Sequence, residues 1–121
     1  MKEKTPNHRA MIEQFHRAMI GNYERVIRET PYRPNFFIQI VEDQGGYEAA
    51  RFLIDRREPS EGFFRLRELG RLDLSAEALI LMPEWAQLFD GELRLVAYNR
   101  LREFGYDMPA ESWRLELPKA E

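Results

Sequence analysis

The sequence contains no cysteine, which excludes structural disulfides, thiolate-bound zinc, cysteine-ligated iron–sulfur clusters and cysteine nucleophiles. It also contains no G-x-G-x-x-G or Walker loop for nucleotide phosphates and no G-x-S-x-G nucleophile motif. The patterns that most often carry cofactor and nucleophile chemistry are therefore missing. We expect no cofactor, no catalytic residues and a protein that is not an enzyme.

Long hydrophobic runs are also missing. No apolar run approaches the ~20 residues that a membrane-spanning helix needs, and residues 1–6 are polar where a signal peptide would be apolar. The formal net charge is −3, which argues against binding of nucleic acid through overall charge. We expect a cytoplasmic protein that does not bind membranes. The remaining route to nucleic-acid binding is a local patch of arginines.

What the sequence does contain is enough apolar material for one core. Hydrophobic residues make up 44% of the 121 residues, and aromatic residues 12%. A chain of this length buries about two-thirds of its surface on folding. We therefore expect a single domain over residues 1–121, with residues 1–6 and 107–121 as peripheral arms.

Apolar residues recur at helical spacing along most of the chain, so we expect an all-α fold, a compact irregular bundle of about six helices. Phe36, Phe37, Ile40 and Val41 follow this spacing, although these residue types also favour strands. A strand therefore remains the alternative to a helix for residues 35–41. The alternating Trp113, Leu115 and Leu117 indicate a short strand or an extended arm near the C-terminus. The expected helices lie near residues 6–29, 35–44, 47–54, 60–69, 75–81 and 90–104.

Start and stop signals support these helices. Thr5-Pro6 marks the first start, and Ser60 and Asp90 are placed to cap the fourth and the last helix. Either Asp73 or Ser75 caps the fifth. Gly70 and Gly105 are typical of the residue that follows a helix.

Two histidines and four carboxylates are the candidate metal ligands. His8 and His16 lie eight residues apart on one expected helix, about 12 Å along its axis, too far to share one ion. Paired carboxylates could bind Mg²⁺ or perform acid–base work. Arg65, however, lies four residues after Glu61, and an ion pair of this kind explains the pattern without a site. The four carboxylates are Glu61, Glu68, Asp73 and Glu77.

Two groups of residues are candidates for an interface. Trp85, Leu88 and Phe89 lie in an apolar connection, and aromatic residues are enriched at interface cores. The alternative is that they close the bundle, and this alternative is favoured. A mixed solvated surface is likewise the favoured interpretation of the arginines. These candidate arginines are Arg56, Arg57, Arg65, Arg67 and Arg71, within an arginine-containing stretch from Arg51 to Arg71.

The segment from Gly62 to Leu79, GFFRLRELGRLDLSAEAL, resembles a group of small bacterial proteins of uncharacterised function. Shorter matches flank it, and together they cover about half of the chain. The resemblance implies a small helical domain and assigns no functional residue. The flanking matches are Gly46-Tyr47, Ala49-Ala50, Leu88-Phe89, Arg100-Leu101 and Gly105-Tyr106.

Three functions follow, in order of preference. The first is a non-enzymatic protein-interaction domain, an accessory or inhibitor-like partner of a larger bacterial or phage-borne assembly, which binds another protein or itself. The second is a nucleic-acid-associated helical domain that uses Arg51–Arg71. The third is a metal-dependent enzyme that uses the four carboxylates.

Overall fold

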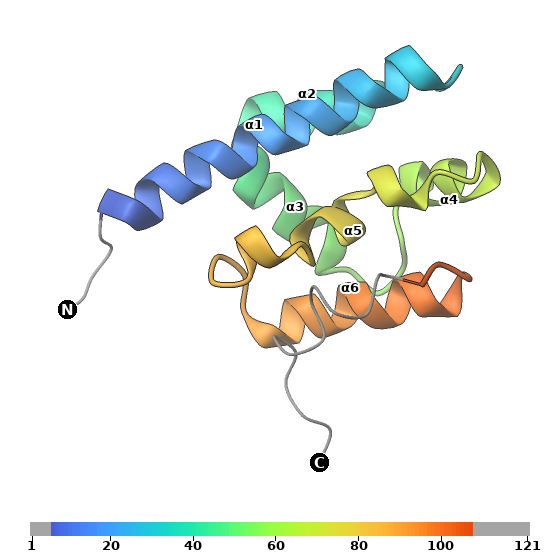
Figure 1. Ribbon diagram of the computed structural model, residues 1–121. Helices are drawn as coiled ribbons and strands as arrows, with labels where there is room; N and C mark the ends of the chain where they lie inside the picture. Colours follow the sequence, from blue (N-terminus) through green and yellow to red (C-terminus); the bar gives the residue numbers. More distant parts are fainter. Residues whose placement is uncertain (1–5, 108–121) are drawn as a thin grey trace.

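The computed structural model describes residues 6–107, and it confirms the all-α fold (Figure 1). No strand is present within residues 6–107. Residues 35–41, for which the sequence leaves a strand as an alternative, are helical. The expected cap at Thr5 and the apolar residues of the C-terminal arm lie outside the described range. The elements are α1 (Pro6–Glu29), α2 (Asn35–Gln44), α3 (Gly46–Ile54), α4 (Glu61–Glu68), η1 (Leu72–Leu74), α5 (Ala76–Ile80), η2 (Pro83–Trp85) and α6 (Gly91–Glu103).

The helices form three layers. The long helix α1 packs on α2, α3 and η1, and α5 packs on α3, η1 and α6. In Figure 1, α1 lies on one side of the molecule and α6 on the opposite side, with α3 and α5 between them. More than half of the residues of each middle helix are buried, because neighbouring elements cover them.

Side-chain caps set three helix starts as the sequence indicates. The Ser60 hydroxyl accepts a hydrogen bond from the Phe63 N–H at 3.1 Å, and Asp90 accepts one from the Leu93 N–H at 2.8 Å. Ser75, rather than Asp73, caps α5. Gly70 follows α4 with φ of 71°, a conformation that side chains with a Cβ rarely adopt.

The start of α3 is built differently, because its cap position is Gly45 and offers no side chain. His16 of α1 supplies the missing acceptor: its Nδ1 accepts the Gly46 N–H at 2.8 Å. The two helices cross so closely that a Cβ on Gly46 would lie 2.7 Å from the Cα of His16. A side chain on one helix thus caps another helix across a glycine contact.

Aromatic rings fill the core beneath the N-terminal half of α1. Phe15 is fully buried, and its ring lies 5.3 Å from Trp85 and 4.9 Å from Phe89. Tyr47 stacks on Phe89, with ring centres 5.2 Å apart. Trp85 and Phe89 therefore close the bundle, which is the alternative that the sequence favours over an interface.

Candidate functional site

A cavity of about 510 Å³ lies beside the C-terminal half of α1. The N-terminal ends of α2, α4 and α5 and the end of α3 complete its wall. Five aromatic side chains line the cavity: Tyr23, Tyr32, Phe36, Phe37 and Phe63.

No helix within residues 6–107 is both long and apolar enough to cross a membrane.

Tyr32 owes its position to the turn after α1. The Thr30 hydroxyl donates to the carbonyl of Val26 at 2.7 Å and accepts the Tyr32 N–H at 3.1 Å. The guanidinium of Arg65 lies over the tyrosine ring, 5.4 Å from its centre. Burial and the charge of Glu61 raise the pKa of the Tyr32 hydroxyl, and Arg65 opposes the shift.

Phe36 is the most exposed large hydrophobic residue among those described, with 59% of its surface accessible to solvent. It lies in the first turn of α2, two residues after the buried Pro34, and it lines the cavity. Most of its ring surface is in water, where an apolar group costs free energy unless a partner covers it.

Glu77, which lines the cavity, forms a buried ion pair with Arg100. Glu77 and Arg100 are 3% and 6% exposed, and Nη1 of Arg100 lies 2.9 Å from the Glu77 carboxylate. Arg100 also donates to the carbonyls of Arg56, at 2.8 Å, and Leu53. Burial raises the pKa of the Glu77 carboxyl, while the arginine acts in the opposite direction. The pair therefore ties α5 and α6 to the end of α3.

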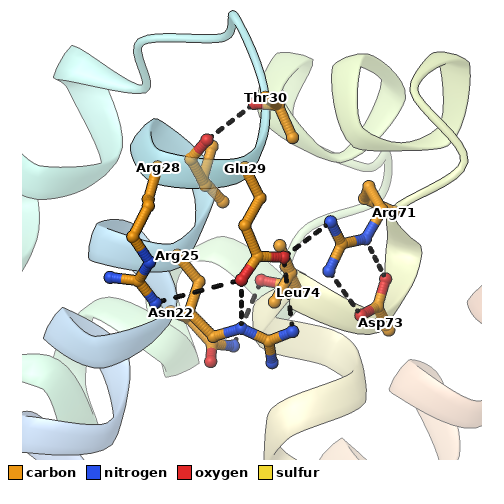
Figure 2. A network of polar contacts seen from close by, with 9 residues as sticks. Asn22, Arg25, Arg28, Glu29, Thr30, Arg71, Asp73 and Leu74 are labelled. Carbon is orange, nitrogen blue, oxygen red and sulfur yellow. Dashed lines mark hydrogen bonds and ion pairs between the residues drawn. The ribbon is translucent and has the colours of Figure 1, made fainter.

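A second polar network holds the end of α1 against η1 (Figure 2). Arg71 donates to both oxygens of Asp73, at 3.0 and 3.1 Å. The same arginine lies 2.9 Å from Glu29, and Asn22 donates to the Leu74 carbonyl at 3.2 Å. Hydrogen bonds from Arg25 and Arg71 lower the pKa of Glu29. The long-range contact from Arg71 to Glu29 was not expected from the sequence.

The four candidate carboxylates do not form a site. Asp73 pairs with Arg71 and Glu77 with Arg100, while Glu61 lies at the cavity and Glu68 is exposed. Among residues 6–107, no three His, Asp or Glu side chains are grouped as metal ligands. The expected Glu61–Arg65 ion pair is wrong, because Arg65 turns toward Glu68 at 3.5 Å and covers the Tyr32 ring. The two histidines are half-buried, and His16 is engaged as the cap of α3.

The candidate interface residues lie in different environments. Trp85, Leu88 and Phe89 are core residues, 8%, 4% and 3% exposed, so their side chains are not available on the surface. Three of the candidate arginines lie over aromatic rings: Arg56 over Phe52, Arg65 over Tyr32 and Arg67 over Phe104. Arg71 is held by Glu29 and Asp73, and Arg57 is exposed.

The cavity itself was not anticipated from the sequence. Helical spacing and the turn with two prolines, Pro31 and Pro34, account for its aromatic residues without a cavity. The available signal was the density of aromatic residues directly after those prolines, at Tyr32, Phe36 and Phe37. Periodicity does not show whether such rings touch each other or enclose a space.

Comparison with protein families, with curated proteins and with solved structures finds no match for this chain. Any function of the cavity has therefore to be inferred from its own residues.

Proposed function

We propose that this protein is a non-enzymatic protein-interaction domain that binds an apolar segment of a partner protein in the cavity between α1, α2 and α4. The observation that carries the proposal is the set of five aromatic side chains around about 510 Å³ of space, with Phe36 59% exposed. Aromatic residues are enriched in the energetically dominant centres of interfaces. The volume suits a few inserted side chains, because ligand pockets span roughly 300–1,000 Å³.

Three polar side chains that line the cavity are already engaged, which favours binding over catalysis. The one deeply buried carboxylate, Glu77, is already held by Arg100 at 2.9 Å. Ser60 and Ser75, the two hydroxyls at the helix starts, act as caps. A general base or a nucleophile must be free to reach a substrate. The wall thus offers apolar surface and shape, which are the means by which a binding domain recognises a partner.

Selection from a library of random displayed peptides on the full-length immobilised chain tests the proposal. We expect enriched peptides to carry large apolar residues and to bind wild-type protein measurably by fluorescence anisotropy. Phe36→Ala, which removes the exposed ring, and Ala76→Leu, which fills part of the cavity, each weaken binding at least about fivefold, because interface anchors contribute more than ~1 kcal/mol each.

Phe52→Ala is the matched control. Phe52 is an exposed helical phenylalanine, 44% accessible, that does not line the cavity. Its replacement leaves peptide affinity unchanged. Melting temperatures of all three variants show that the fold is intact. Enrichment of no peptide, or peptides that bind the Phe36 and Ala76 variants as tightly as wild type, would contradict the proposal.

A further inference from the structure

The charged side chains that line the cavity are Arg56, Glu61 and Glu77, and they are not equally available to a ligand. The guanidinium of Arg56 lies 5.2 Å from the ring centre of Phe52, a residue outside the cavity. The Glu77 carboxylate is compensated by Arg100. Of the three, only the Glu61 carboxylate has neither an ion-pair partner nor a ring contact.

Glu61 begins α4 and is exposed. Within residues 6–107, no basic nitrogen lies within 4.0 Å of its carboxylate. Arg65, one turn further along, pairs with Glu68 instead. The charge of Glu61 also reaches the neighbouring phenol, because it contributes to the raised pKa of Tyr32. Glu61 therefore offers an unpaired carboxylate at the α4 end of the cavity.

The aromatic wall is compatible with a cation. The face of an aromatic ring is electron-rich and attracts ammonium and guanidinium groups. The Tyr32 ring already holds the Arg65 guanidinium at 5.4 Å on one side. Tyr23, Phe36 and Phe37 line the same space, and no arginine or lysine of residues 6–107 lies over their rings.

From this arrangement we infer that the preferred occupant is a basic apolar segment of a partner protein, in which a Lys or Arg lies next to a large apolar residue. The apolar side chain fills the aromatic cavity, and the cation pairs with Glu61. This inference rests on the proposed function, because it names the chemistry of the partner for the same cavity.

Two fluorescein-labelled synthetic peptides test the inference. Both carry the same leucine and tryptophan anchors, with lysine at the intervening positions in one peptide and glutamate in the other. We expect the lysine peptide to bind the full-length protein about two- to fivefold more tightly, which is the range for one exposed charge pair. Glu61→Gln removes this advantage, Glu61→Lys reverses it, and rising salt reduces it.

Glu92→Gln is the matched control, because Glu92 is an exposed glutamate in the first turn of α6 and does not line the cavity. It leaves the ratio of the two affinities unchanged. Equal binding of both peptides, or preference for the glutamate peptide, overturns the inference and leaves the proposed function standing. Binding of neither peptide contradicts the proposed function as well.

Other occupants give distinct results. If sedimentation equilibrium shows a dimer that Phe36→Ala dissociates, a second copy fills the cavity and the inference is wrong. A third peptide with the sequence of residues 108–121 tests the chain's own C-terminal segment. If it displaces the lysine peptide and Phe36→Ala abolishes its binding, the occupant is internal and the inference is again overturned.

Discussion

The two ends of α1 cover two aromatic clusters of different character. Under its N-terminal half, the buried Phe15, Trp85 and Phe89 and the half-buried Tyr47 lie with neighbouring ring centres 4.9–5.3 Å apart. Beside its C-terminal half, none of Tyr23, Tyr32, Phe36 and Phe37 packs on another aromatic ring of the described residues, and a cavity lies between them. Similar residue types therefore build a filled core at one end and an open wall at the other.

The largest expected effect comes from the filled end. Phe15→Ala removes a fully buried ring and should lower the free energy of unfolding by about 3–5 kcal/mol. Phe36→Ala at the open end should change it by less than about 0.5 kcal/mol, because that ring is mostly in water. Urea denaturation measures both. Equal losses would show that the open end is as well packed as the closed one.

The next effect on stability is expected at the ion pair between Glu77, which lines the cavity, and Arg100. Arg100→Met leaves the Glu77 carboxylate buried without its partner, which should cost about 3–5 kcal/mol at pH 7. The control Glu77→Leu/Arg100→Met removes both charges and should cost much less. If the double variant is as unstable as the single one, packing rather than the stranded charge causes the loss.

The same pair gives a dependence on pH. Because burial raises the pKa of Glu77, its folded state holds the proton more tightly than the unfolded chain does. The contribution of this group to stability is therefore fully present below the unfolded pKa, and it is lost as the pH rises through the folded pKa. In Arg100→Met the loss should be larger at pH 7 than at pH 4. Urea denaturation at both pH values checks the sign.

His16 offers a smaller test of the filled end. His16→Ala removes the acceptor of the Gly46 N–H and should cost about 1–2 kcal/mol, the range for a lost cap or an unsatisfied backbone donor. The exposed neighbour Arg17 is the control, and Arg17→Ala should change stability by less than about 0.5 kcal/mol. Hydrogen exchange at the start of α3 should accelerate in the His16 variant alone.

The smallest effect is expected at the network of Figure 2, which secures α1 at the open end. Arg71→Gln should lower the melting temperature slightly at low salt, and the difference should shrink at high salt because these side chains are partly exposed. The lowered pKa of Glu29 means that its contribution is present above the unfolded pKa and is lost as the pH falls. A difference that persists at high salt and at low pH would instead indicate lost packing of the arginine stem.

The sequence by itself determined the helices and most of their ends. Apolar spacing located all six α-helices, and Ser60, Asp90 and Gly70 act at the expected termini. These features depend on residues within about four positions of each other, so they can be inferred from local order.

Only the tertiary structure decided which aromatic residues are buried and which enclose a space. Trp85 and Phe89 became core because Phe15, some 70 residues earlier, lies against both rings, while Phe36 stays exposed at the cavity. His16, Glu29 and Glu77 each also have a partner outside their own helix. Such contacts depend on how helices distant in the sequence pack together, and periodicity along the chain contains no information about that packing.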